Sequence, residues 1–185
     1  MNIHTIILAA GEGSRMKSKR AKSLQMVGGK TMLEMICKTA GSLSSKITLI
    51  VGFDKESIIS ESKKFNFDIS TCEQSLPIGT GDAVKCGINE VDNADKVLVL
   101  YGDVPLIKKE TLVNLVSIDD QSLTILSTEV DDPFGYGRVK KDDDGNVTEI
   151  IEEKDASNED KKIQEIFTGI LCCNKGLLQE ALKEI

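Results

Sequence analysis

The chain is poor in the residues that many catalytic sites need, with one histidine, three prolines and no tryptophan among 185 residues. Because His4 falls in the first apolar stretch, we expect it to serve in packing rather than in acid–base or nucleophilic catalysis. No apolar run approaches the roughly 20 residues of a membrane span, and no signal-peptide pattern precedes the first predicted strand. These absences favour a cytoplasmic protein with no membrane partner.

Cysteine usage and overall charge exclude further classes. The five cysteines contain no C-x-x-C pair, so neither a metal site nor a disulfide is indicated, and free thiols are expected. A net charge of −7 offers no general attraction for nucleic acid, so we expect no such partner. Any anionic ligand must therefore be held by a local concentration of positive charge.

Such a concentration follows the first predicted strand. Gly11 and Gly13 can adopt positive φ and let backbone N–H groups approach a ligand closely. Five cations then crowd into eight positions of an otherwise acidic chain: Arg15, Lys17, Lys19, Arg20 and Lys22. Bare amides beside concentrated cations predict a nucleoside triphosphate site, although a simple turn stays open as an alternative on these residues alone.

Two other phosphate-binding motifs fit less well. A dinucleotide fingerprint requires a third glycine where Met16 stands, and the acidic Glu34 lies inside a helical pattern. A P-loop requires its second glycine at the same position, where a side chain would obstruct the phosphate cradle. The sequence therefore disfavours both.

Strands and helices alternate along the first part of the chain. Apolar runs predict strands at 3–10, 46–52, 65–72 and 96–101, with helices between them, including one capped by Thr31 and one capped by Asp54. From residue 122 the pattern changes to strands at 122–130, 137–142, 146–153 and 166–173 before a final helix. We expect one α/β domain over 1–185, with a Rossmann-like, mixed and mainly parallel sheet flanked by helices. Residues 1–117 would form a nucleotide-binding half, and residues 118–185 a β-rich half.

Asp103 is the second residue of chemical interest. It follows the most apolar strand at a glycine turn, which places a carboxylate at the carboxyl edge of the predicted sheet. A carboxylate that faces phosphates can bind Mg²⁺, which prefers oxygen ligands shared with substrate. A turn aspartate that satisfies local amides is an equal alternative.

Together these motifs resemble the sugar-1-phosphate nucleotidyltransferases, and most of all the uridylyltransferase domains of bacterial N-acetylglucosamine-1-phosphate uridylyltransferases. The loop L-A-A-G-x-G-[TS]-R-M is complete at residues 8–16. Further matching segments follow in order: Gln74, 79–81, 101–106, 132–138, 152–156 and 164–169. The resemblance implies the nucleotide-diphospho-sugar transferase fold, with a β-rich sugar-binding half. It also implies uridylyl transfer from UTP to a sugar 1-phosphate in nucleotide sugar biosynthesis.

The resemblance further implies a set of site residues. Arg15 and Lys22 would be catalytic and steady the triphosphate, and Asp103 would hold Mg²⁺, the implied cofactor. Because the attacking sugar phosphate is already ionised, catalysis needs positioning and charge neutralisation rather than a general base. Gly137 and Glu152 would face the sugar. The other implied substrate-binding residues are Leu8, Ala9, Ala10, Gly11, Gly13, Gln74, Gly79, Thr80, Tyr101, Gly102 and Thr168.

The chain departs from the family pattern at several positions. Ala21 stands where proline usually precedes the catalytic lysine, which leaves the loop less rigid. Pro77 stands in place of a second glutamine near the base, and Phe167 replaces an asparagine that contacts the sugar. Loss of that amide leaves the sugar open, with N-acetylglucosamine 1-phosphate as the first expectation. The chain also ends before the family's second metal ligand, so we expect a truncated domain, and its oligomeric state is open.

Two other functions stay open on the sequence. One is a nucleotidyltransferase for a different nucleotide or sugar phosphate, to which Pro77 and Phe167 point. The other is a non-catalytic nucleotide-sugar-binding module. The presence of Arg15, Lys22 and Asp103 together counts against the second alternative.

Overall fold

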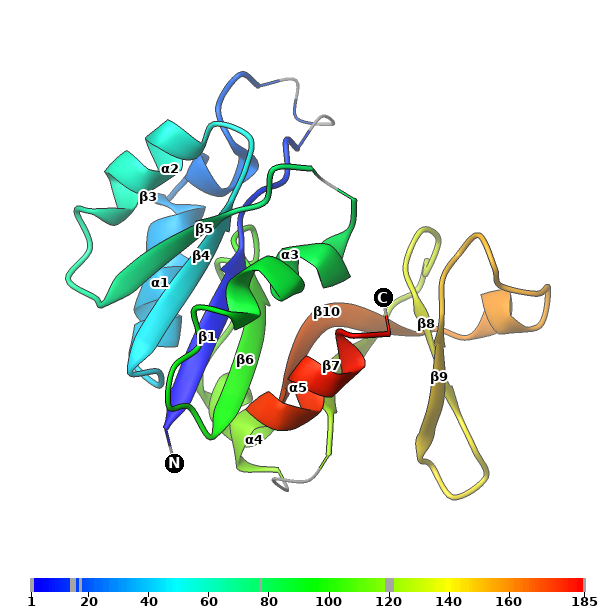
Figure 1. Ribbon diagram of the computed structural model, residues 1–185. Helices are drawn as coiled ribbons and strands as arrows, with labels where there is room; N and C mark the ends of the chain where they lie inside the picture. The colour runs from blue at the N-terminus through cyan, green and yellow to red at the C-terminus, as the bar shows by residue number, and fades with distance from the viewer. Residues whose placement is uncertain (1, 14–15, 17, 77, 119–121, 185) are drawn as a thin grey trace. The chain divides into compact units, whose positions relative to one another are not determined.

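The computed structural model describes residues 2–13, 16, 18–76, 78–118 and 122–184 (Figure 1). The chain forms two compact units. The first contains residues 1–124 and 171–185, and the second contains residues 125–170. Strand β10 (Glu165–Asn174) begins in the second unit and ends in the first, so the chain leaves the first unit once and returns to it.

The first unit is built on a mixed, mainly parallel sheet, as the sequence predicted. Strand β1 pairs in parallel with β4 and with β6, and β4 pairs in parallel with β5. The end of β10 lies antiparallel to β6, with Leu171 opposite Val99. The strand order is β5 (Ile69–Glu73), β4 (Lys46–Val51), β1 (Ile3–Leu8), β6 (Lys96–Tyr101) and β10.

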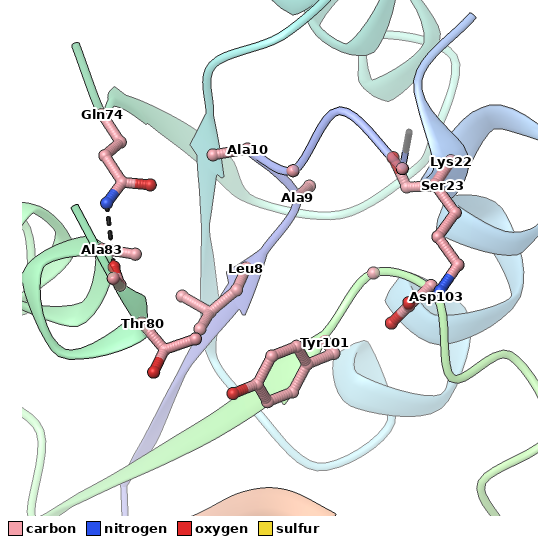
Figure 2. A pocket seen from close by; sticks show the side chains of 14 residues that line it. Leu8, Ala9, Ala10, Lys22, Ser23, Gln74, Thr80, Ala83, Tyr101 and Asp103 are labelled. Carbon is pink, nitrogen blue, oxygen red and sulfur yellow. Dashed lines mark hydrogen bonds and ion pairs between the residues drawn. The ribbon is translucent and has the colours of Figure 1, made fainter. Parts of the chain in front are cut away.

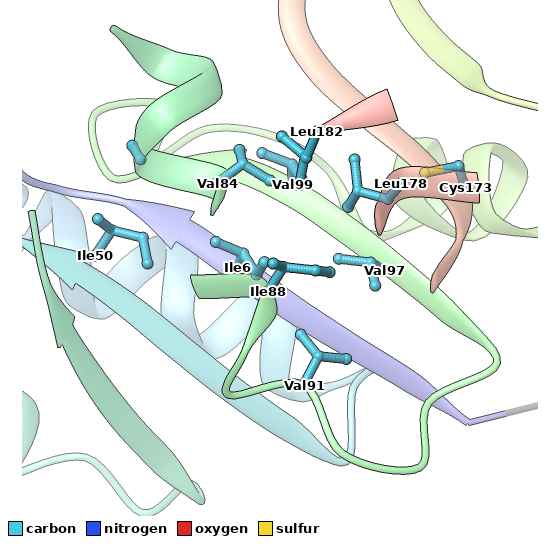
Figure 3. Packing of buried hydrophobic residues seen from close by; sticks show 11 residues of the cluster. Ile6, Ile50, Val84, Ile88, Val91, Val97, Val99, Cys173, Leu178 and Leu182 are labelled. Carbon is cyan, nitrogen blue, oxygen red and sulfur yellow. The ribbon is translucent and has the colours of Figure 1, made fainter. Parts of the chain in front are cut away.

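Apolar side chains on one face of this sheet pack against helices α3 (Thr80–Ile88) and α5 (Lys175–Ala181), as Figure 3 shows. Gly87 allows the close approach of α3, because a Cβ there would lie 2.6 Å from Ile50 Cδ1. Each fully buried aliphatic side chain contributes about 1.5–3 kcal/mol to folding. The cluster contains Ile6, Ile50, Ala83, Val84, Ile88, Val91, Val97, Val99, Cys173, Leu178 and Leu182.

The remaining helices of the first unit are α1 (Met32–Gly41), α2 (Lys55–Ser62) and α4 (Lys109–Ser117). The predicted cap of α1 is confirmed, since Thr31 Oγ1 accepts the N–H of Glu34 at 3.1 Å. The side-chain cap predicted for α2 is wrong. Asp54 does precede that helix, but its backbone has φ of 55° and its carboxylate accepts the N–H of Ala21 instead.

The second unit is β-rich and contains all but the first residue of β7 (Thr124–Glu129), together with β8 (Arg138–Lys141), β9 (Val147–Ile151) and the first part of β10. Strands β8 and β9 form the predicted antiparallel hairpin, with a register shift between Lys140 and Lys141. Its turn is closed by Asp142, whose pKa lies below its usual value because the backbone and side chain of Asn146 donate to the carboxylate. Strand β10 pairs with both β7 and β8.

Several short elements were not predicted. Strands β2 (Met26–Val27) and β3 (Lys30–Thr31) pair antiparallel, and the 3-10 turns η2 (Lys22–Leu24) and η3 (Asp160–Lys162) fall in segments expected to be loops. Such elements are too short for hydrophobic periodicity to reveal.

Histidine and cysteine have structural roles. His4 is buried, its Nε2 lies 2.7 Å from Thr48 Oγ1, and burial lowers its pKa to about 4, which confirms the predicted packing role. All five cysteines are free thiols, as expected. Burial raises the pKa of Cys37 and of Cys173 to about 12, so neither supplies a thiolate near neutral pH. No helix in the described part of the chain is long and apolar enough to cross a membrane.

The Thr31 cap gives a stability prediction. Thr31→Ala removes the acceptor of the Glu34 N–H and should lower the free energy of unfolding by about 1 kcal/mol in urea denaturation. Thr31→Ser keeps the hydroxyl and should retain most of that stability. Equal losses in both variants would show that the hydroxyl does not stabilise α1.

Candidate functional site

A pocket of about 340 Å³ lies at the carboxyl ends of β1 and β6 in the first unit (Figure 2). This is the sheet edge where parallel α/β proteins bind ligands. The pocket brings together twelve residues predicted from the sequence: Leu8, Ala9, Ala10, Gly11, Gly13, Lys22, Gln74, Gly79, Thr80, Tyr101, Gly102 and Asp103. Ser23 and Ala83 also line it and were not predicted.

The glycine-containing loop forms one edge of the pocket. Gly13 has φ of 64°, which glycine adopts without strain, and a Cβ on it would lie 2.8 Å from Lys22 Cβ. Gly11 does not adopt positive φ, although the sequence allowed it, and a Cβ there would meet no atom within 4 Å. Gly13 is therefore the glycine that the loop requires, because it lets the stem of Lys22 cross the backbone.

The turn after β6 brings a carboxylate to this loop. Gly102 donates its N–H to Leu8 O at 2.9 Å, and a Cβ on it would lie 3.1 Å from Ser23 Cβ and 3.3 Å from Ala9 Cβ. The next residue, Asp103, forms an ion pair with Lys22. The side chains of Lys22 and Asp103 are 40% and 28% exposed, so a ligand in the pocket can reach both charges.

The opposite wall carries a fixed amide. Gln74 is buried, and its Nε2 donates to Gly79 O at 3.0 Å and to Asp82 Oδ2 at 2.8 Å. Gly79 has φ of 141°, a conformation open to glycine, and precedes the first turn of α3, where Thr80 lies. Figure 2 shows Gln74 and Thr80 across the pocket from Lys22 and Asp103, with Leu8 and Ala9 between them. One wall is thus charged, and the other offers the Gln74 carbonyl oxygen and the Thr80 hydroxyl, since both N–H groups of the Gln74 amide are engaged within the protein.

The remaining predicted site residues lie elsewhere. Gly137, Glu152 and Thr168 belong to the second unit, where a Cβ on Gly137 would lie 3.7 Å from Glu152 Oε1. Thr168 Oγ1 donates to Leu126 O at 2.7 Å, which engages that hydroxyl within the unit. Arg15 lies outside the described residues, as does Pro77.

Besides Ala83, the sequence assigned no role at the site to Ser23 or Asp54. Ser23 is buried, and its Oγ has no hydrogen-bond partner among the described residues. Asp54, 33 positions further along the chain, accepts a hydrogen bond from the N–H of Ala21, directly before Lys22. Neither residue belongs to a recognised binding motif. No local sequence pattern predicts a contact such as that between Asp54 and Ala21, which lie 33 positions apart.

The donor set suits a metal that is shared with substrate. Within the described residues, no three His, Cys, Asp or Glu side chains converge to hold an ion by themselves. Asp103 offers one partly exposed carboxylate beside a cationic side chain, at the sheet edge that holds the pocket. Magnesium is commonly bound by one or two carboxylates together with substrate phosphates, so this set fits Mg²⁺ that arrives with a polyphosphate.

The fold is that of an α/β protein with a pocket at the carboxyl edge of its parallel strands. The family model of the MobA-like NTP transferase domain matches residues 5–138, and the chain belongs to that family. It therefore carries an NTP transferase domain.

Curated relatives agree with this family. The chain is 41% identical over 182 residues to the bifunctional protein GlmU of Psychrobacter sp. (strain PRwf-1), covering 98% of this chain and 40% of that protein. It is 43% identical over 187 residues to GlmU of Alcanivorax borkumensis, covering 100% of this chain and 41% of that protein. The chain thus spans about two fifths of the length of these relatives.

A solved structure supports the fold. A protein assigned as a glucose-1-phosphate thymidylyltransferase from Bacillus anthracis superposes with a TM-score of 0.78 at 22% identity, covering 96% of this chain and 73% of that one. At this identity the likeness bears on the fold alone. It agrees with the predicted nucleotide-diphospho-sugar transferase fold.

Gly13→Ala tests the packing of the loop. The new Cβ would meet Lys22 Cβ in a backbone conformation that alanine adopts at a cost of about 1 kcal/mol, so Lys22 should be displaced. We expect nucleotidyl transfer to fall at least about tenfold, equivalent to 1.4 kcal/mol of transition-state stabilisation. The control is Gly145→Ala, at φ of 84° with nothing within 4 Å of its Cβ. Comparable losses of activity in the two variants would contradict a specific role for Gly13.

Proposed function

We propose that the chain catalyses Mg²⁺-dependent uridylyl transfer from UTP to a sugar 1-phosphate, giving a UDP-sugar and pyrophosphate. The observation that carries the proposal is the pairing of Lys22 with Asp103 at the mouth of a pocket that also holds the fixed amide of Gln74. A cation and a metal-binding carboxylate suit a triphosphate. The amide wall suits a base and its ribose.

The reaction needs little from the protein beyond position and charge. An oxygen of the sugar phosphate attacks the α-phosphorus of UTP, and the bond from that phosphorus to the bridging oxygen of pyrophosphate breaks. Lys22 would neutralise phosphate charge, and Arg15 would add to it from the basic loop, residues 10–21, that precedes Lys22. Asp103 would hold Mg²⁺, which supplies charge neutralisation at the phosphates when bound. No proton has to be removed, so the burial of His4 is compatible with this chemistry.

Lys22 and Asp103 neutralise each other in the free protein. Phosphate can replace Asp103 as the partner of Lys22, and a metal ion can replace Lys22 as the partner of Asp103. Because both side chains are partly exposed, this exchange requires no opening of the core. The ion pair would therefore hold the two groups in position until substrate arrives.

The sugar is proposed to be N-acetylglucosamine 1-phosphate, held through Gly137, Glu152 and Thr168 of the second unit. Phe167 leaves a different sugar as a second candidate. It donates its N–H to Gly137 O at 2.8 Å, and Gly137 immediately precedes β8. A phenyl ring lacks the amide donor and acceptor that would bind an acetamido group, so glucose 1-phosphate, which has a hydroxyl in its place, is the second acceptor.

Pyrophosphate release tests the proposal. The four ribonucleoside triphosphates are crossed with N-acetylglucosamine 1-phosphate and glucose 1-phosphate in the presence of Mg²⁺. We expect release with UTP, and the preferred sugar phosphate identifies the acceptor. Release with another nucleotide would support the alternative transferase. UTP binding without release from any pair would support a binding module.

Asp103→Asn separates metal binding from nucleotide binding. The amide keeps the size of the side chain but lacks the charge that Mg²⁺ requires, so kcat should fall by about 100-fold. Affinity for UTP measured without Mg²⁺ should stay within about twofold by isothermal titration, less than 0.5 kcal/mol. Asp92→Asn, whose side chain is 82% exposed, is the matched control for loss of one charge. An unchanged kcat in Asp103→Asn would remove this residue from the metal site.

A further inference from the structure

Asp54 has an unusual position for a residue that precedes a helix. A carboxylate there commonly accepts an N–H from the first turn of its own helix. Within the described residues Asp54 makes no such cap, and its Oδ2 accepts the N–H of Ala21 at 3.0 Å. Its backbone has φ of 55°, a left-handed conformation that Asp tolerates better than most residues do. The Asp54 side chain thus binds a residue 33 positions earlier in the chain, and not the first turn of its own helix.

The segment around Asp54 contacts both ends of the basic loop. Phe53 donates its N–H to Ala10 O at 3.1 Å, where the loop leaves β1. Gly52 lies so close to the same residue that a Cβ on it would be 3.0 Å from Ala10 Cβ. Asp54 binds Ala21, where the loop ends. Residues 52–54 therefore fix the base of the loop that runs from Ala10 to Ala21.

Ala21 determines where Lys22 begins. It is completely buried, and its carbonyl oxygen accepts the N–H of Leu24 at 3.0 Å in the turn η2. With its N–H bound to Asp54 and its C=O bound to Leu24, Ala21 is held on both sides. Hydrogen bonds to a carboxylate are stronger than those between neutral groups. The path of the Lys22 side chain toward Asp103 starts from this fixed point.

We propose that Asp54 is a positioning residue that acts through Lys22. Its carboxylate anchors the backbone before Lys22 and keeps the ammonium group directed at the phosphates. The inference rests on the proposed role of Lys22 in nucleotidyl transfer. Asp54 would act on the site through the backbone of Ala21 and would not contact substrate itself.

The first test compares Asp54→Gly with Asp54→Asn. Both residues accept the left-handed conformation, but only asparagine keeps a side-chain oxygen for the Ala21 N–H. Asp54→Gly should lower kcat for pyrophosphate release about tenfold, with the KM for UTP within about twofold. Asp54→Asn should stay within about threefold of the wild type. Equal kcat values in the two variants would overturn the proposal.

Ala21→Pro supplies a rescue. Ala21 has φ of −51° and ψ of 143°, which proline can adopt, and a proline ring fixes the backbone without an N–H. Added to Asp54→Gly, it should recover at least half of the lost activity, because the ring replaces the restraint. A folded double variant, judged by wild-type circular dichroism, that recovers none would overturn the proposal. A merely structural loss at Asp54 would not be restored in this way.

Two further variants separate this inference from the proposed function. In a Lys22→Ala background, Asp54→Gly should cause no additional loss of activity, since Asp54 acts through Lys22. If Lys22→Ala keeps full turnover, the proposed role of Lys22 fails. If Lys22→Ala is inactive while Asp54→Gly is fully active, only the positioning role fails. Glu56→Ala, an exposed carboxylate of α2, is the control for loss of charge and should match the wild type.

Amide hydrogen exchange provides a readout that does not depend on turnover. The N–H groups of Ala21, Leu24 and Gln25 should exchange at least tenfold faster in Asp54→Gly than in the wild type, because the anchor of the turn is lost. Amides of β4, which carries the segment, should be unchanged. Unchanged exchange at Ala21 in Asp54→Gly would overturn the proposal even if the protein shows no transferase activity.

Discussion

The close approach of the backbones after β1 and β6 is the constraint on which the site depends. The N–H of Gly102 binds Leu8 O, and the space around Gly102 is closed by Ala9 and Ser23. A Cβ at position 102 would lie 3.1 Å from Ser23 Cβ and 3.3 Å from Ala9 Cβ, so both neighbours would have to shift slightly. The residue after Gly102, Asp103, forms an ion pair with Lys22, which begins the turn η2 beside Ser23. A backbone contact between two parallel strands thus creates a pair of charged side chains that lie far apart in sequence.

The pocket has two chemically different walls. Lys22 and Asp103 present charge on one side, while Gln74, held by Gly79 and Asp82, presents a fixed amide on the other. The protein carries a net charge of −7, so attraction for an anionic substrate is local rather than general. The segment 52–54 holds the base of the basic loop and links β4 to the charged wall.

The sequence was most informative where a local pattern corresponds to a local structure. Apolar runs predicted the strands of the parallel sheet, and the spacing of Thr31 and Glu34 predicted the cap of α1. Motif residues also predicted most of the pocket lining. It failed where a partner is distant: the Asp54 carboxylate was expected to cap its own helix, but the buried N–H of Ala21 competes for it. The path of β10 through both units and the burial of Ser23 likewise depend on tertiary contacts.

Hydrogen–deuterium exchange with UTP and Mg²⁺ tests directly whether a nucleoside triphosphate occupies this pocket. Bound UTP should protect backbone amides jointly in three segments that the fold brings together, at residues 9–13, 79–81 and 101–103. The surface of α4 should be unaffected. If saturating UTP protects other segments and leaves these three at their free rates, the nucleotide does not bind in this pocket.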